Sequence, residues 1–278
     1  MKRLTAAVLF LVGTLSGCGG SDDGRDQAHF LPKVVTTTTI VADVVRHVGG
    51  DDVEVVSLMG PGVDPHLYKP SAGDVRRMAA ADIVFFSGLH LEGKMGDVLG
   101  RLDGRGVPSV AVTSCMPEEA LISISGTGAH DPHVWFDVNL WREAITCVRD
   151  ALRDLDPDAA QAYAYRAEAY SEELRILDLE IEGRLATIPV ERRVLVTAHD
   201  AFAYFGRAYG LQVRGLLGVS TASEAGAVDV QELADLVAEQ GIPAVFVETS
   251  VSPRYIRALR EAVAARGMDV AEGGSLYS

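Results

Sequence analysis

A long, uninterrupted helical pattern in the middle of the chain constrains the fold most. Asp156-Pro157 is typical of a helix start, with Asp as the N-cap and Pro at the first helical position. Apolar residues then recur at helical spacing as far as Ile188, and Pro189 ends the pattern. A helix over 157–188 would be about 48 Å long at 1.5 Å per residue. A partner helix in a coiled coil is the alternative, but we predict a rigid connection between two lobes.

Strand and helix patterns alternate on both sides of this helix, which is typical of parallel α/β folds. We therefore predict two lobes, each a mainly parallel sheet flanked by helices, at residues 33–156 and 189–278. Because ligands bind beyond the carboxyl ends of strands in open α/β sheets, a site is expected in the cleft between the lobes. Ser71, Asn139 and Asp229 are the expected N-caps of three of the helices. The expected strands are 33–36, 53–59, 82–86, 107–112, 193–197, 212–216 and 244–248, and the expected helices are 40–48, 71–81, 139–152, 201–209, 229–240 and 253–266.

The first 32 residues are predicted to serve export and attachment. Lys2 and Arg3 precede an apolar run that is far shorter than the ~20 residues of a membrane-spanning helix. A positive start, a short apolar stretch and small residues describe an export signal. The Leu-Ser-Gly-Cys sequence that ends at Cys18 resembles a bacterial lipobox, so residues 1–17 are predicted as a signal peptide and 18–32 as a lipidated cysteine and tether. A plain signal peptide with a chance Cys is the alternative.

The charge balance argues against nucleic acids as partners, and the sequence leaves open whether the cysteines form a disulfide. The chain has a formal charge of −14, with 39 acidic residues against 25 Lys and Arg, whereas nucleic-acid binders show the opposite balance. Cys115 and Cys147 could pair in an oxidising compartment. Cys147 lies on an apolar helical pattern, which favours a small buried hydrophobic residue instead.

Three histidines carry the predicted chemistry. His66 and His133 each follow an Asp-Pro pair, and His199 follows a predicted strand. Proline fixes the backbone before an imidazole, and a preorganised ligand loses less entropy when it binds a metal. The three lie far apart in the chain, so only tertiary structure could bring them to one site; unrelated loop or core histidines are the alternative. Weaker candidates are His90 and His130, whereas His29 in the tether and His47 on a helix are expected to be uninvolved.

The motifs around these histidines resemble those of the zinc/manganese solute-binding lipoproteins of bacterial ABC transporters, the TroA/ZnuA-like family, and most of all its TroA branch. The likeness runs from about Val34 to Ser278. It implies two α/β lobes joined by one long helix, with a metal ion between them. The motifs are Met59–Tyr68, Asp131–Asp137, Val196–Phe205, Gly218–Glu224 and Val247–Ser250.

The resemblance also implies the ligands, because His66, His133 and His199 occupy the positions of family ligands. The fourth family ligand, an Asp after a Leu-Tyr/Phe-Ser motif, would lie beyond Ser278. If that Asp is lacking, a water, the Ser278 carboxylate or a nearby side chain must complete the shell; Glu248 is expected rather to support a ligand from behind. Three imidazoles and one carboxylate suit Zn²⁺, with Mn²⁺ or Fe²⁺ as alternatives.

The expected function is a lipid-anchored, periplasmic or extracellular receptor, not an enzyme, that captures the metal as a monomer and delivers it to an ABC permease. A zinc hydrolase is the alternative, since three histidines with an open fourth position are also a catalytic pattern. Asp200 or Glu248 would then act as general base. A third possibility is a surface adhesin in which the metal is only structural.

Overall fold

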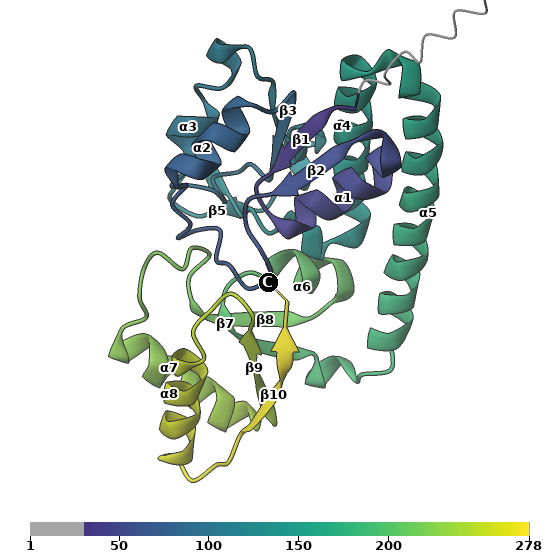
Figure 1. Ribbon diagram of the computed structural model, residues 1–278. Helices are drawn as coiled ribbons and strands as arrows, with labels where there is room; N and C mark the ends of the chain where they lie inside the picture. The colour runs from purple at the N-terminus through teal and green to yellow at the C-terminus, as the bar shows by residue number, and fades with distance from the viewer. Residues whose placement is uncertain (1–30, 278) are drawn as a thin grey trace, which may run out of the picture. The chain divides into compact units, whose positions relative to one another are not determined.

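The computed structural model describes residues 31–277 (Figure 1). The predicted signal peptide, Cys18 and most of the tether lie outside the described residues. Within residues 31–277, none of the helices combines the length and the apolar character needed to cross a bilayer.

Four parallel strands form the sheet of the first lobe, in the order β2-β1-β3-β4. Successive residues of a strand face opposite sides, so Val34 of β1 packs into one apolar cluster and Val35 into another. β-Branched and aromatic residues dominate β1 and β3, as expected for strands covered on both faces. The strands are β1 (Lys33–Thr36), β2 (Glu54–Ser57), β3 (Ile83–Phe86) and β4 (Ser109–Ala111).

Helices cover both faces of this sheet (Figure 1). On one side, α1 (Thr39–Gly49) buries a valine-rich face against α4 (Val138–Leu155). On the other side, α2 (Ala72–Ala79) and α3 (Gly96–Leu99) enclose a smaller cluster rich in methionine. Ser71 caps α2 as predicted, and its backbone and Asp74 complete a capping box. The short elements of this lobe are η1 (Gly50–Asp52), η2 (Asp103–Arg105), η3 (Val112–Cys115), η4 (Glu118–Ala120), β5 (Ser123–Ile124), β6 (Ala129–His130) and η5 (Val134–Phe136).

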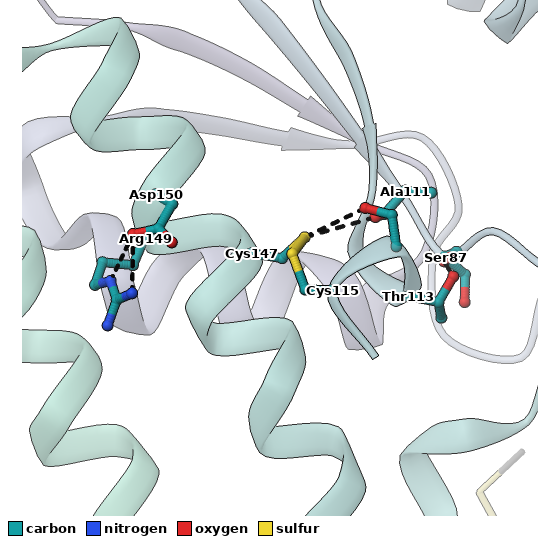
Figure 2. The surroundings of a disulfide bond; sticks show 8 residues. Ser87, Ala111, Thr113, Cys115, Cys147, Arg149 and Asp150 are labelled. Carbon is teal, nitrogen blue, oxygen red and sulfur yellow. Dashed lines mark hydrogen bonds and ion pairs between the residues drawn. A yellow bond between two sulfur atoms is a disulfide. The ribbon is translucent and has the colours of Figure 1, made fainter. Parts of the chain in front are cut away.

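A disulfide joins Cys115 at the end of η3 to Cys147 on α4 (Figure 2). The expectation that Cys147 serves only as a small hydrophobic residue was therefore wrong. Its side chain is buried, as the apolar pattern indicated, but it is also bonded. The cap of α4 differs as well, because Asp137 accepts from the Leu140 amide and Asn139 lies inside the helix.

The long connecting helix is present. A single 3₁₀ turn, η6 (Pro157–Ala159), leads into α5 (Ala160–Leu185), which runs beside α1 and α4. Its apolar face is fully buried only as far as Leu174, while Leu177 is 42% exposed. Beyond Leu174, Ile181 still packs, partly buried, against the apolar cluster of the first lobe.

The second lobe holds four strands in two hydrogen-bonded parallel pairs, β7–β8 and β9–β10, with β7 next to β9. α7 and α8 pack together and bury residues such as Leu233 and Leu259 against these strands. Asp229 is not the N-cap of α7 as predicted; Gly226 is, and the Asp229 carboxylate accepts from its amide. The elements after α5 are η7 (Val190–Arg192), β7 (Val194–His199), α6 (Ala203–Tyr209), β8 (Gln212–Leu217), α7 (Ala227–Gln240), β9 (Ala244–Glu248), α8 (Arg254–Ala264) and β10 (Ala271–Leu276).

One helix that follows the second lobe's first strand packs on the first lobe. Tyr204 of α6 is fully buried in the same apolar cluster as α1 and α4. Its hydroxyl accepts from the Ile122 amide (2.9 Å) and donates to the Asp131 carbonyl (3.0 Å). The Phe202 ring lies against Phe136 with 4.3 Å between ring centroids. α6 therefore fixes the end of β7 to the first lobe.

Candidate metal centre

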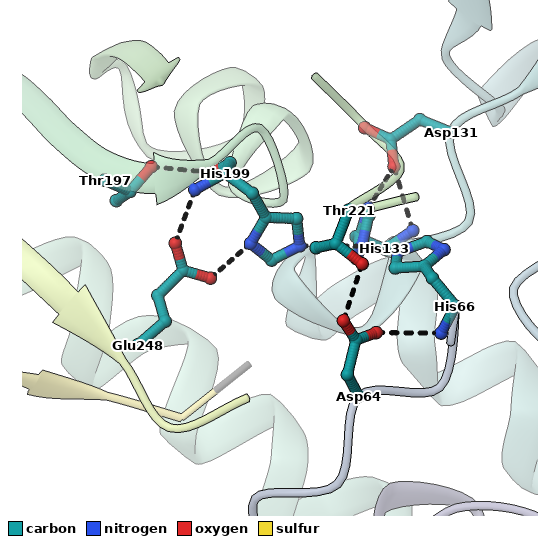
Figure 3. A network of polar contacts seen from close by, with 8 residues as sticks. All are labelled: Asp64, His66, Asp131, His133, Thr197, His199, Thr221 and Glu248. Atoms are coloured by element: carbon teal, nitrogen blue, oxygen red, sulfur yellow. Dashed lines mark hydrogen bonds and ion pairs between the residues drawn. The ribbon is translucent and has the colours of Figure 1, made fainter. Parts of the chain in front are cut away.

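Three histidines from separate segments meet at one point (Figure 3). His66 lies in the loop after β2, His133 in the turn between β6 and η5, and His199 at the carboxyl end of β7. The Nε2 atom of His133 lies 3.2 Å from Nε2 of His66 and 3.4 Å from Nε2 of His199. All three side chains are buried, with exposed fractions of 7%, 2% and 2% for His66, His133 and His199.

These separations match a tetrahedral metal site. Ligand nitrogens bound at ~2.0–2.1 Å to a tetrahedral zinc ion lie about 3.3 Å apart. Two of the distances between histidine nitrogens fall close to this value. Among the described residues, this is the one group of three His, Cys, Asp or Glu side chains whose ligand atoms lie within 4.8 Å of one another. The arrangement can therefore hold a divalent cation without first bringing ligands together.

Asp131 fixes the ring of His133. Its Oδ1 atom accepts from the His133 amide at 2.9 Å and from the ring Nδ1 at 2.7 Å. A proton on Nδ1 leaves a lone pair on Nε2, which faces the other two rings. Asp131 was predicted only as part of a motif, with no role of its own. Its position two residues before a histidine in Asp-Pro-His was the available signal.

Glu248 holds His199 in a similar way from the second lobe. Oε1 accepts from the His199 amide at 2.8 Å, and Oε2 lies 2.5 Å from the ring Nδ1. The carboxylate side chain is fully buried at the end of β9, behind the ring and away from the Nε2 atoms. Glu248 therefore lies where a residue that orients His199 would lie.

Asp64 fixes the backbone at His66. Its Oδ1 atom accepts from the His66 amide at 2.9 Å, in the same local turn that Asp131 makes at His133. Its other oxygen, Oδ2, accepts from the Thr221 hydroxyl of the second lobe at 2.6 Å. This second contact was not predicted, because Thr221 is distant from Asp64 in the chain.

Burial keeps two of the imidazoles neutral at pH 7. Desolvation, followed by the charges of His133 and His199, lowers the pKa of His66 to about 3. Burial also lowers the pKa of His133, although Asp131 acts in the opposite direction. Metal ligation requires the neutral ring, so no proton has to leave His66 or His133 before a cation binds near neutral pH.

The other histidines lie away from this centre. His47 is exposed on α1, and its ring stacks on Tyr170 with centroids 4.0 Å apart. His90 and His130, the weaker candidates, line a different cavity of about 600 Å³ in the first lobe. His29 lies outside the described residues. Asp200, considered as a general base, follows His199 directly, and burial raises the pKa of its carboxyl.

Comparisons with known proteins agree with this architecture. The family described as zinc-uptake complex component A, periplasmic (ZnuA), matches residues 34–278. The manganese-binding lipoprotein MntA of Bacillus subtilis is 48% identical over 277 residues, which cover 100% of this chain and 90% of MntA. The iron-binding protein YfeA of Yersinia pestis is 31% identical, over 99% of this chain and 87% of its own.

A solved structure shares the fold as well as the sequence. The zinc-binding protein TroA of Treponema pallidum is 46% identical over 278 residues, covering 100% of this chain and 89% of TroA. The structure of this periplasmic protein superimposes with a TM-score of 0.88 at 47% identity, over 90% of this chain and 89% of the other.

Proposed function

Because the chain belongs to the ZnuA family of metal-binding solute-binding proteins of ABC uptake systems, we propose that it captures a divalent transition metal with His66, His133 and His199. The observation that carries this proposal is the convergence of the three buried Nε2 atoms, at 3.2 and 3.4 Å. The ion is the cargo of transport, and the family consists of transport proteins and not of enzymes. The hydrolase and adhesin alternatives gain no support from these comparisons.

Zinc is the first choice of metal and manganese the second. Imidazole nitrogens favour Zn²⁺ over Mn²⁺ in the order of divalent metal affinities, whereas oxygen-rich sites suit Mn²⁺. The names of the relatives MntA, TroA and YfeA refer to manganese, zinc and iron respectively. The three-nitrogen set of this chain supports zinc, and metal availability in the cell decides which ion is carried.

Delivery requires the protein to stay near its permease. We propose that Cys18 carries the lipid that anchors the chain outside the cell membrane, where it hands the ion to an ABC permease as a monomer. MntA is named a lipoprotein, which supports this anchoring. A flexible tether would let the soluble part reach the permease while the lipid stays in the bilayer.

Metal-dependent thermal stability tests the proposal. At a free ion concentration of 100 times Kd, binding stabilises the folded state by ~2.7 kcal/mol, which raises Tm by about 5–10 °C for a chain of this size. We expect Zn²⁺ to raise the Tm of the wild type, and His133→Ala to lose most of that rise. His47→Ala, on the exposed face of α1, is the control and should keep it. No rise with either Zn²⁺ or Mn²⁺ in the wild type would overturn the proposal.

A further inference from the structure

The two Asp-Pro-His segments use their aspartates differently. In both, the carboxylate accepts from the amide of the histidine, at 2.9 Å for Asp64 and for Asp131. Asp131 then binds the ring of its own histidine, whereas Asp64 turns its second oxygen to the Thr221 hydroxyl at 2.6 Å. The same Asp-Pro-His motif therefore orients the imidazole ring at His133, whereas at His66 it connects the loop to Thr221.

Thr221 belongs to the second lobe. It lies in the segment between β8 and α7, while Asp64 lies in the first lobe's loop between β2 and α2 (Figure 3). Both side chains are partly buried, so water competes weakly for the contact. A hydrogen bond to a charged acceptor is stronger than one between neutral groups. The contact thus links the two lobes at the loop that carries one of the three histidines.

The link from Thr221 to the His66 ring is short and stiff. Asp64 holds the His66 amide, and Pro65 between them restricts the backbone. A displacement of the Thr221 segment therefore acts on the backbone of His66 through a single side chain. His133 and His199 have their own carboxylates, Asp131 and Glu248, on their ring nitrogens.

From this asymmetry we infer that the Asp64–Thr221 contact is a positioning pair that slows metal release by holding His66 in the site while the second lobe is in place. This inference rests on the proposed function. Neither residue is one of the three proposed ligands; Asp64 positions the loop that carries His66, and Thr221 connects that loop to the second lobe. Loss of the contact frees the loop to withdraw His66, so the off-rate rises while the other two ligands remain.

The test measures Zn²⁺ release. Protein loaded with one equivalent of Zn²⁺ is mixed with an excess of a chromophoric chelator, and the release rate is followed by absorbance. Thr221→Val, which removes the hydroxyl and keeps the shape, should release Zn²⁺ about ten-fold faster, as expected for the loss of one charge-assisted hydrogen bond. Thr221→Ser should restore the wild-type rate. Ser223→Ala, an exposed residue of the same segment, is the matched control and should change nothing.

A double-mutant cycle shows whether Thr221 acts through Asp64. In an Asp64→Ala background, Thr221→Val should add no further acceleration, because the acceptor is already gone. A wild-type release rate in Thr221→Val, or equal accelerations in the presence and absence of Asp64, would overturn the inference. A wild type that binds no Zn²⁺ would instead overturn the proposed function, so the two failures are distinguishable.

Discussion

Two of the contacts between the lobes differ in character. At the α6 contact, formed by Phe202, Tyr204 and Arg207, the second part of the chain enters the core of the first lobe. At the Asp64–Thr221 contact, one hydroxyl meets one partly buried carboxylate. The first contact is built from apolar burial and hydrogen bonds to the main chain, and it holds the frame of the site. The second can open without exposing a core, and it therefore suits a step in which metal must leave.

The largest expected effect comes from removing the buried centre of the α6 contact. Tyr204→Ala deletes a fully buried ring and should lower the free energy of unfolding by about 3–5 kcal/mol. Tyr204→Phe keeps the ring but leaves the Ile122 amide without its acceptor, at a cost of about 1–3 kcal/mol. Urea denaturation measures both. If Thr221→Val destabilised the protein as much as Tyr204→Ala, the distinction between the two contacts would be lost.

The disulfide should affect stability without affecting the metal. Cys115 and Cys147 are 32 residues apart in the chain and join η3 to α4 (Figure 2). In the chain-entropy model, removing such a link costs about 3–4 kcal/mol. We expect Cys115→Ser with Cys147→Ser to lower the urea midpoint and to leave Zn²⁺ affinity, measured by isothermal titration, unchanged. A large loss of Zn²⁺ affinity would mean that the disulfide of the first lobe also controls the geometry of the metal site.

The carboxylates behind the rings should affect affinity more than stability. Glu248→Gln removes the negative charge beside His199 Nδ1 and should weaken Zn²⁺ binding by about 10–100-fold. Asp131→Asn should weaken Zn²⁺ binding to a similar extent, because Asp131 accepts a hydrogen bond from the ring of His133. Glu232→Gln, on the exposed face of α7, is the control. Competition with a chelator of known affinity measures the effect, and wild-type affinity in both variants would contradict these roles.

A separate prediction concerns the pH dependence of the metal-free protein. The pKa of folded His66 is about 3, below the ordinary value of 6.5, so the unfolded chain binds one more proton between these values. Stability should therefore fall as the pH drops from 6.5 toward 3, by at most about 1.4 kcal/mol per pH unit for this one group. The comparison is the slope of unfolding free energy against pH in wild type and in His66→Leu. An equally steep slope in the variant would assign the proton to another group.

Local patterns predicted most of the elements. β-Branched runs identified strands such as β1 and β3, and the capping residue Ser71 located α2. β10 was not predicted, because its Gly273 and Gly274 are poor strand formers and the strand depends on pairing with β9. The place of α6 in the first lobe was missed for a similar reason, since tertiary packing decides which core receives Tyr204.

For the metal centre, too, local motifs were predictive and contacts between distant segments were not. The three histidines were chosen from their local motifs, and the structure brings them together. Their supporting groups were harder to find, because they come from distant segments. Glu248 was named through its strand end, whereas the Asp64–Thr221 contact joins residues that no local pattern connects. The pairing of Cys115 with Cys147 was one of two possibilities that the sequence left open, and the apolar pattern around Cys147 favoured the other one.

The most direct test of the central claim is anomalous diffraction at the zinc edge from crystals grown with one equivalent of Zn²⁺. The account predicts one strong peak at ~2.0–2.1 Å from the Nε2 atoms of His66, His133 and His199. A fully occupied zinc ion elsewhere, or one bound by fewer than all three rings, would contradict it.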